Sequence, residues 1–126
     1  MKLGELIAGL DVALASAGDA ATRICDITED SRTVVPGSLF VARAGLKADG
    51  RTFAVDAAHA GAAAVLSDDS TMSIPGVATI VAKDVAFAAA AIAERFYGKP
   101  SDKLDVIAVT GTNGKTTTTW LVWQLL

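Results

Sequence analysis

The chain has 126 residues, of which 52% are hydrophobic and 20% charged, and its formal net charge is −3. This apolar content is sufficient for a packed core and excludes an intrinsically disordered chain, and the length allows one small domain, or one domain and part of a second. The acidic balance gives no electrostatic footprint for nucleic acid or for an anionic membrane surface, so neither class of partner is expected.

The cysteine count and the amino-terminal segment indicate the compartment. Cys25 is the only cysteine, so a disulfide framework is excluded, and we expect this side chain to be a small buried hydrophobe. Charged residues at positions 2, 5 and 11 leave no apolar segment long enough for a signal peptide, and the longest apolar run, residues 85–93, is too short for a membrane helix. We therefore expect a cytoplasmic monomer without membrane insertion.

Apolar periodicity predicts the elements of the first half of the chain. A short amphipathic helix is expected at the start, where apolar residues follow i, i+3, i+4, i+7 spacing: Leu3, Leu6, Ile7 and Leu10. Residues 22–28 alternate like a strand, with Ile24 on one face and Cys25 and Ile27 on the other. Pro36-Gly37 predicts a turn, and residues 38–42 predict a buried strand followed by a loop at 45–50.

Two helices and two further strands are expected between residues 52 and 98. Thr52 is a candidate N-cap for a helix to residue 60, with Phe53 and Ala57 facing inward and Gly61 as its left-handed stop. Residues 62–66 and 77–81 are expected to be strands on either side of a polar loop. Asp84 is expected to cap a second helix ending near residues 97–98, and its predicted inner face is Phe87, Ala91 and either Ile92 or the stem of Arg95. This alternation predicts a layered α/β domain in residues 1–98.

A candidate phosphate-binding loop follows a linker at residues 99–103. Residues 106–109 form a β-branched run typical of a strand buried on both faces of a parallel sheet. Gly111, Asn113 and Gly114 allow positive φ, so successive N–H groups can line a concavity that suits an anion. Lys115 adds a cation for the β- and γ-phosphates, and the following helix directs its positive end at them.

The residues after this lysine support the same interpretation. Thr116 to Thr119 are poor helix formers, each costing up to roughly 0.7 kcal/mol relative to Ala, which indicates that hydroxyls are wanted there, with Thr116 placed to ligate Mg²⁺. The usual P-loop has four residues between its glycines, whereas here only Thr112 and Asn113 separate them. The alternative is an ordinary strand–turn–helix junction, but Gly-Lys-Thr at this position favours a nucleotide site.

Residues 104–126 supply only one strand, one loop and the start of one helix. The helix carries apolar side chains on nearly every side, so we expect it to pack against elements of a second domain that this chain lacks. Trp120 and Trp123 are expected to take part in that packing, and the alternative is an adenine-stacking pair. The predicted fold is therefore α/β: a small mixed-sheet domain followed by the first strand, P-loop and helix start of a parallel-sheet ATPase domain.

Taken together, the motifs resemble the Mur ligase family from about residue 28 to the end. The matching residues are Asp30-Ser31-Arg32, Pro36 to Ala42, Gly45, Asp49-Gly50, Phe53, Ala57, Gly61-Ala62 and Val109 to Thr118. Members that add D-alanyl-D-alanine usually carry a serine at the position of Thr112. The resemblance is therefore closer to the branch that adds the third peptide residue, a diamino acid, to UDP-MurNAc-L-Ala-D-Glu.

This resemblance implies how the sites are divided. An amino-terminal domain, here residues 1–98, holds the UDP end of the substrate, and the central domain, beginning at about residue 104, holds ATP. A Rossmann-like carboxy-terminal domain brings the amino acid. The implied contacts to the UDP-substrate are Glu29, Ser31, Leu46, Lys47 and Ala48, with Arg32 helping to order that site. The implied ATP-binding residues are Gly111, Thr112, Asn113, Gly114, Lys115, Thr116 and Thr117, with Thr116 as a metal ligand.

The implied reaction is amide formation that depends on ATP and Mg²⁺ and passes through an acyl phosphate. Lys115 is the implied catalytic residue, and Ser31 is no candidate nucleophile because phosphoryl transfer relies on positioning and charge neutralisation. The family's second metal ligand and carbamylated lysine are absent from this chain, and His59 is expected to be solvated or packed rather than catalytic. We therefore expect the chain alone to lack turnover.

Three alternatives remain at this point. The chain could be a non-catalytic module that binds a UDP-sugar, or it could belong to the D-alanyl-D-alanine-adding branch. It could also be an unrelated P-loop switch or kinase in which the early motif is coincidental. Without the resemblance, Asp30-Ser31-Arg32 is best interpreted as a turn stabilised by its own side chains.

Overall fold

The computed structural model describes residues 1–15, 17–45 and 49–125. The strands of this part form one sheet in the order β1-β5-β4-β3-β2. The four parallel members are β2 (Asp26–Thr28), β3 (Ser38–Ala42), β4 (Ala64–Ser67) and β5 (Ala78–Ala82). At the edge, β1 (Val12–Leu14) pairs with β5 in the antiparallel direction. The expected α/β fold with a mixed sheet is confirmed.

The central strand β3 supplies the core of both layers. Successive side chains of a strand point to opposite faces, so Leu39 and Val41 join one apolar cluster while Phe40 and Ala42 join the other. All of its residues are buried because β2 and β4 flank the strand and helices cover both faces. This double burial explains why residues 38–42 form a nearly continuous apolar run, as a parallel strand should.

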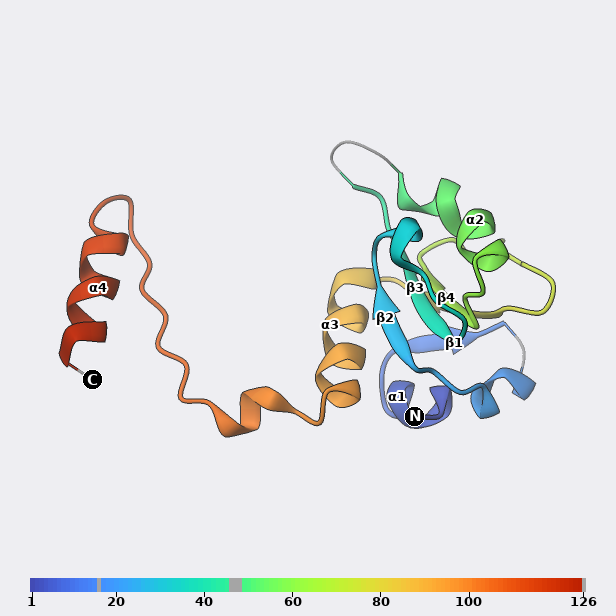
Figure 1. Ribbon diagram of the computed structural model, residues 1–126, viewed down its shortest axis with the longest axis horizontal. Helices are drawn as coiled ribbons and strands as arrows, with labels where there is room; N and C mark the ends of the chain where they lie inside the picture. Colours follow the sequence, from blue (N-terminus) through green and yellow to red (C-terminus); the bar gives the residue numbers. More distant parts are fainter. Residues whose placement is uncertain (16, 46–48, 126) are drawn as a thin grey trace.

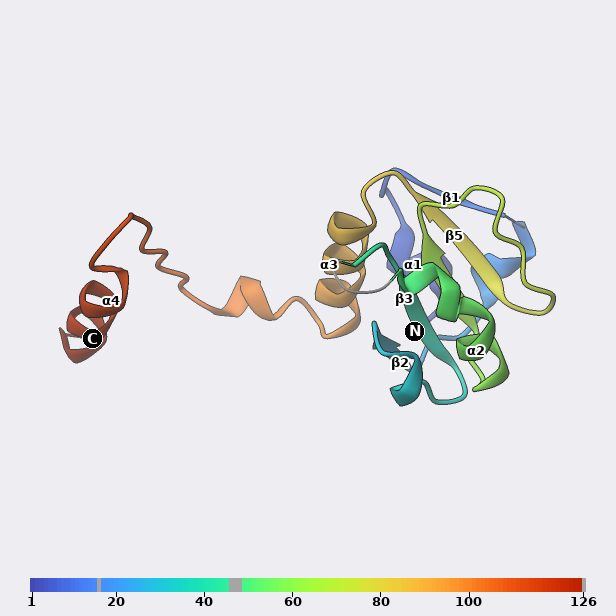
Figure 2. The ribbon, with the colours of Figure 1, turned by 90° about the horizontal axis from the view of Figure 1, so that it is seen from above.

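One face of the sheet is covered by α1 (Leu3–Ile7) and α3 (Val85–Phe96), as Figures 1 and 2 show. The buried helix residues on this side are Leu3, Leu6, Val85, Ala88 and Ile92. The two helices are also tied together, because Arg95 Nη1 donates a 2.7 Å hydrogen bond to the carbonyl oxygen of Leu6. The predicted amino-terminal helix is thus confirmed, with Leu3 and Leu6 fully buried.

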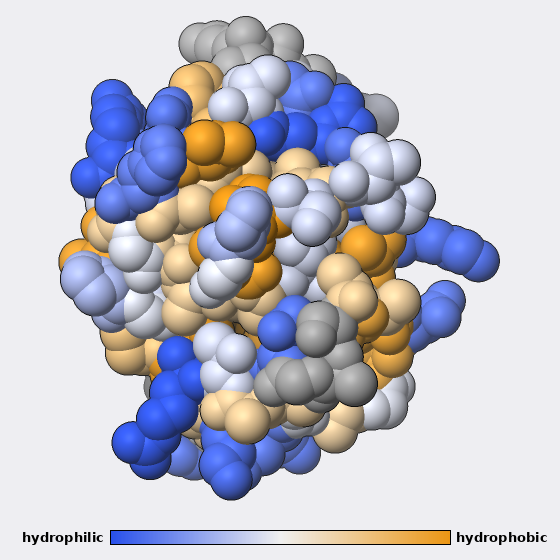
Figure 3. All heavy atoms as spheres, turned by 90° about the vertical axis from the view of Figure 1, so that its right-hand side faces the viewer, coloured by the Kyte–Doolittle hydropathy of each residue, from blue (hydrophilic) through white to orange (hydrophobic). Residues whose placement is uncertain are grey.

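The opposite face is covered by α2 (Ala54–His59), which follows the 3₁₀ turn η3 (Gly50–Phe53). Ala54 and Ala57 pack there against the cluster that contains Phe40. The loop between β4 and β5 lies on the same side and contributes partly buried apolar side chains to that cluster. On the surface seen in Figure 3, apolar atoms form small groups among hydrophilic ones.

The structure confirms Ala57 and Ile92 as inner residues of α2 and α3 but corrects the aromatic residues expected beside them. Phe87 is 67% exposed and Phe53 is 39% exposed, whereas both were expected to face inward. In α3 the buried positions are Val85, Ala88 and Ile92, an i, i+3, i+7 series that starts at the first helical residue. Because half of this helix is alanine, its apolar periodicity is weak, and the large Phe87 suggested the wrong inner face.

The strand expected at residues 22–28 is shorter, and its side chains are arranged differently. β2 begins at Asp26, and both Ile24 and Ile27 contribute to the same apolar cluster, because the backbone before Asp26 does not continue the strand alternation. Cys25 is exposed rather than buried, which corrects a further expectation. Its Sγ lies beside the Pro36-Gly37 turn and donates a 3.1 Å hydrogen bond to the carbonyl oxygen of Pro36.

Of the two predicted helix caps, one is confirmed and one is wrong. Asp84 caps α3 as predicted, since its Oδ1 accepts a 2.9 Å hydrogen bond from the backbone N–H of Phe87. Thr52 is not the cap of α2, because a 3₁₀ turn precedes that helix and Asp49 caps the turn by accepting from the backbone N–H of Arg51. Gly61 has a φ of 105°, as expected of the stop that follows α2.

Sequence reasoning did not predict β1. β1 lies in a stretch of small residues that carries no strand signal, and its position is set by pairing with β5 at the sheet edge. Three further 3₁₀ turns fall in connecting segments: η1 (Ala17–Ala21), η2 (Ser31–Thr33) and η4 (Pro100–Lys103).

After α3 the chain leaves the layered domain and ends in α4 (Lys115–Leu125), as Figure 1 shows. The strand expected at residues 106–109 does not form: these residues are extended and unpaired, and Val106 is 77% exposed. A parallel strand requires neighbours, and the described residues offer none at this position. Among the described helices, none has both the length and the apolarity to cross a membrane.

Candidate functional site

The two glycines that flank the loop at residues 111–114 adopt the positive φ angles that the sequence predicts, whereas Asn113 does not. Gly111 has a φ of 153° and Gly114 a φ of 77°. A side chain at either position would be strained, whereas a Cβ on Gly114 would meet nothing within 4 Å. The glycines are therefore required by backbone conformation, and the space beside Gly114 is open to a ligand.

Lys115 lies at the junction of this loop and α4. Its Nζ donates a hydrogen bond to the carbonyl oxygen of Gly111, so the ammonium group folds back across the bend. α4 begins at the same residue. In its first turn the backbone amide of Thr118 donates a 2.9 Å hydrogen bond to the carbonyl oxygen of Gly114. A cation and the positive end of a helix thus meet at one bend, an arrangement suited to phosphate oxygens.

The threonines that follow differ in their use. Thr119 Oγ1 donates a 2.9 Å hydrogen bond to the carbonyl oxygen of Lys115, so this hydroxyl stabilises the helix. Thr116 lines a hollow of about 380 Å³ together with Thr119, Trp120 and Trp123. Both tryptophans are more than half exposed.

A second group of polar residues lies at the carboxyl ends of the parallel strands. Glu29 follows β2, Arg43 follows β3 and Asp68 follows β4. In open α/β sheets, ligands bind in the crevice outside these strand ends. Arg43 Nη2 lies 3.0 Å from Glu29 Oε2, so an ion pair joins the ends of β2 and β3.

The Asp30-Ser31-Arg32 motif forms a turn stabilised by its own side chains. Asp30 caps η2 by accepting a 3.0 Å hydrogen bond from the backbone N–H of Arg32, and the Arg32 guanidinium pairs with both of its carboxylate oxygens. The side-chain hydrogen bonds from Arg32 lower the pKa of Asp30 to about 2. The turn keeps Ser31 partly exposed at the strand ends.

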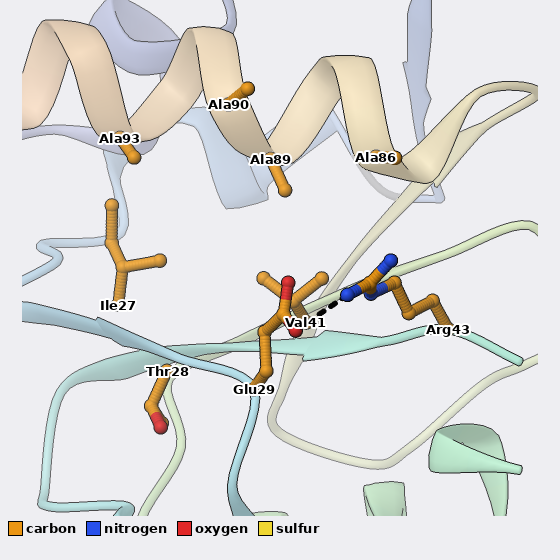
Figure 4. A pocket seen from close by; sticks show the side chains of 9 residues that line it. All are labelled: Ile27, Thr28, Glu29, Val41, Arg43, Ala86, Ala89, Ala90 and Ala93. Atoms are coloured by element: carbon orange, nitrogen blue, oxygen red, sulfur yellow. Dashed lines mark hydrogen bonds and ion pairs between the residues drawn. The ribbon is translucent and has the colours of Figure 1, made fainter. Parts of the chain in front are cut away.

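Two cavities adjoin this turn, and Glu29 lines both. The larger, of about 510 Å³, is formed by Glu29, Asp30, Ser31, Arg32 and Phe53. The smaller, of about 330 Å³, lies between the strand ends and α3 and is shown in Figure 4. Its lining residues are Ile27, Thr28, Glu29, Val41, Arg43, Ala86, Ala89, Ala90 and Ala93.

A third charged cluster joins η3 to the end of β4. Arg51 Nη2 lies 2.6 Å from Asp49 Oδ2 and its Nη1 lies 3.4 Å from Asp68 Oδ1. The side-chain hydrogen bonds from Arg51 lower the pKa of Asp49. Gly50 lies directly against Arg43, whose carbonyl oxygen accepts a 2.9 Å hydrogen bond from the Gly50 amide.

The structure brings some of the predicted substrate residues together. Glu29, Ser31 and Arg32 line one cavity, while Leu46, Lys47 and Ala48 lie outside the described residues. His59 is exposed at the end of α2, in agreement with a solvated residue.

Sequence reasoning missed Arg43 and the role of Phe53 as a cavity wall. Arg43 directly follows a buried parallel strand, and a charged residue at the carboxyl end of such a strand could have been recognised as a candidate site residue. Phe53 offered no comparable signal, because an apolar residue near a helix start is most often part of the core.

Comparison with known proteins connects this arrangement to a family. The protein-family model described as "Mur ligase family, catalytic domain" matches residues 23–97, more than half of the chain. The chain belongs to the Mur ligase family. The matched segment includes the strand ends and both cavities, and it ends before the Gly111–Thr117 loop.

Curated Mur ligases match the whole chain, including that loop. The UDP-N-acetylmuramoyl-L-alanyl-D-glutamate--2,6-diaminopimelate ligase of Syntrophomonas wolfei is 46% identical over 100% of this chain and 26% of its own length. The protein of the same name from Chlorobaculum tepidum is 45% identical over 99% of this chain and 25% of its own. The chain thus spans about a quarter of the length of these relatives.

Solved structures with this fold are also Mur ligases. A crystal structure of MurF from Acinetobacter baumannii has a TM-score of 0.69 and 25% identity, covering 93% of this chain and 25% of that one. The MurF ligase of Thermotoga maritima, solved in complex with ADP, has a TM-score of 0.55 and 29% identity, covering 77% of this chain and 21% of that one.

Proposed function

We propose that this chain is the substrate-holding and ATP-loop part of an ATP-dependent ligase. The ligase adds a diamino acid, 2,6-diaminopimelate, to UDP-MurNAc-L-Ala-D-Glu in peptidoglycan precursor synthesis. The observation that carries the proposal is the presence, in one chain, of a cavity lined by Glu29, Ser31 and Arg32 and of a glycine bend closed by Lys115. The choice of diamino acid rests on the names of relatives such as those that are 46% and 45% identical.

The cavity at the strand ends is the proposed site for the UDP end of the substrate. Ser31 supplies a hydroxyl and Arg32 a guanidinium, which are suitable partners for a uracil edge and a diphosphate. The Arg32 side chain is 86% exposed, so it can reach a ligand while two of its N–H groups remain on Asp30. We propose Leu46, Lys47 and Ala48, which the family resemblance implies, as further contacts.

The bend at residues 111–117 is the proposed site for ATP and Mg²⁺. The positive φ of Gly114 and the open space beside it fit a phosphate cradle, and Lys115 places a cation there. Gly111, Thr112, Asn113 and Gly114 would hold the phosphates through their backbone, together with Lys115, Thr116 and Thr117, and Thr116 would ligate the metal. When bound, ATP would supply its γ-phosphoryl group to the substrate carboxylate with ADP as the leaving group, and attack of the amine on the resulting acyl phosphate would form the amide and release phosphate.

The residues of this chain then act by binding and positioning. Lys115 neutralises charge on the phosphates, and α4 directs its amino-terminal amides to the same place. Residues 1–98 form the UDP-substrate domain, 99–103 the linker and 104–126 the start of the ATP-binding domain. We propose that the chain is a cytoplasmic monomer and that, by itself, it binds both nucleotides without turnover.

The proposal is tested by two nucleotide titrations of the ¹⁵N-labelled 126-residue chain, followed by NMR. UDP is expected to shift the amides of residues 29–32, and ATP with Mg²⁺ those of residues 111–117, in two separate sets. UDP shifts confined to residues 111–117 would contradict a UDP site at residues 29–32. In a turnover assay with ATP, Mg²⁺, UDP-MurNAc-L-Ala-D-Glu and diaminopimelate, release of ADP with product would disprove the absence of turnover.

The D-alanyl-D-alanine-adding ligase is the second candidate, because the solved structures that share the fold are MurF ligases. The identities of 25% and 29% to those structures are lower than the 46% to the diaminopimelate-adding relative. A polypeptide with the full length of the relatives separates the two when it is assayed with both acceptor substrates. Product formed only with D-alanyl-D-alanine would favour the second candidate.

A further inference from the structure

The Glu29–Arg43 ion pair stands between the two cavities at the strand ends. Glu29 lines both cavities, whereas Arg43 lines only the smaller one. Figure 4 shows the two side chains pointing toward one another below α3. Arg43 therefore pairs with the one carboxylate that lines both cavities.

The alanines of α3 make this pair the main polar feature of the smaller cavity. Ala86, Ala89, Ala90 and Ala93 offer no side-chain donor or acceptor, and Ile27 and Val41 complete an apolar floor. Thr28 also lines the cavity, but its Oγ1 already accepts a 3.0 Å hydrogen bond from the Asp30 amide and lies 2.7 Å from Thr33 Oγ1.

The Glu29–Arg43 ion pair contributes little to folding stability. The side chain of Arg43 is 49% exposed and that of Glu29 is 55% exposed, and ion pairs in such positions contribute little to the free energy of unfolding. The ion pair has a larger effect on a charged ligand. With Arg43 present the ligand meets a neutral pair, whereas without Arg43 it meets a free carboxylate. Asp30, the neighbouring acid, already has Arg32 as its partner, so only Arg43 neutralises Glu29 in the described part of the site.

We propose that Arg43 is a positioning residue for the anionic end of the nucleotide. It holds the Glu29 carboxylate at the ends of β2 and β3 and neutralises it, so that a diphosphate can enter the neighbouring cavity without repulsion. This inference rests on the proposed binding of a uridine diphosphate moiety. The contribution of Arg43 to binding should therefore increase with the negative charge of the ligand.

The test uses the 126-residue chain, three uridine ligands of increasing charge and titration calorimetry. For Arg43→Leu we expect binding of UDP to weaken about three- to tenfold and that of UMP to weaken less. Uridine, which carries no phosphate, is expected to bind within about twofold of the unaltered chain. Arg43→Lys keeps the positive charge and should restore most of the UDP affinity. In Glu29→Gln/Arg43→Leu the repulsive carboxylate is gone, so the loss should be smaller than in Arg43→Leu alone.

Each outcome decides the inference. Equal loss for uridine, UMP and UDP would show a structural role for Arg43, and no loss for UDP would show no role, so either result overturns the proposal. Urea unfolding of every variant checks the fold, and midpoints close to that of the unaltered chain are expected. Failure of the unaltered chain to bind any of the three ligands would instead disprove the proposed function on which the inference rests.

Discussion

Arg32 and Asp30 are joined by three hydrogen bonds although only one residue separates them. The Arg32 guanidinium donates from Nε at 2.9 Å and from Nη2 at 2.7 Å, and its backbone amide donates at 3.0 Å. The motif is therefore a self-contained turn, and it presents Ser31 between two charged side chains. The same geometry explains why the pKa of Asp30 lies at about 2 rather than 3.8.

This pair predicts a pH dependence that can be measured at one carboxyl group. Because folding lowers the pKa of Asp30, the stability contributed by the pair is fully present above the ordinary value of 3.8 and is lost as the pH falls through about 2. In Arg32→Ala we expect the Asp30 carboxyl, followed by NMR, to titrate closer to 3.8. Asp69 is the internal control, because Thr71 lowers its pKa and the substitution leaves that contact intact. An Asp30 midpoint that does not change in the variant would contradict the assignment to Arg32.

Gly50 predicts a steric cost where the backbone passes close to Arg43. A Cβ at this position would lie 2.6 Å from the Arg43 carbonyl oxygen, which the backbone holds in place. Gly50→Ala should lower the free energy of unfolding by about 1–3 kcal/mol, measured by urea denaturation. Gly76→Ala is the matched control: its φ is 78°, but a Cβ would meet nothing within 4 Å, so only about 1 kcal/mol of backbone strain is expected. A loss for Gly50→Ala no greater than that of the control would argue against the close approach.

The face of α3 that packs on the sheet can be tested by two substitutions. Ile92 is fully buried, and Ile92→Ala should lower the free energy of unfolding by about 2–5 kcal/mol because a cavity is left behind. Phe87 is 67% exposed, so Phe87→Ala should change it by less than about 0.5 kcal/mol. The reverse order of the two losses would restore the helix phase expected from the sequence.

These examples show what could be predicted from the sequence. Residues 39–42 are apolar without interruption because both faces of β3 are buried, and the strand was predicted with its correct bounds, 38–42. Asp84 was predicted as the cap of α3 because an aspartate before an apolar periodic segment satisfies free helix amides. Such local signals depend on only a few neighbouring residues.

The features that could not be predicted depend on tertiary contacts. The phase of α3 was wrong because its alanines carry almost no periodic signal, and β1 was missed because only pairing with β5 defines it. Arg43 could not be assigned to Glu29, since the two residues are 14 positions apart and meet only when β2 and β3 pair. The prediction of a strand at residues 106–109 was wrong for the described chain, because a strand needs neighbouring strands to pair with.

Lys115 gives the most direct test of the proposed ATP site. The chain places its ammonium group on the Gly111 carbonyl oxygen, where it can transfer to phosphate oxygens, and alanine is an excellent helix former, so Lys115→Ala should leave α4 intact. We expect the affinity for ATP with Mg²⁺ to fall roughly 10- to 100-fold, because hydrogen bonds to charged groups contribute about 1.5–3 kcal/mol. UDP affinity should stay within about twofold, since UDP is proposed to bind residues 29–32. Lys103→Ala, which removes an exposed lysine from η4, is the control and should alter neither affinity. Calorimetric titration measures both, and a parallel loss of ATP and UDP binding in Lys115→Ala would contradict the division of the two nucleotides between separate sites.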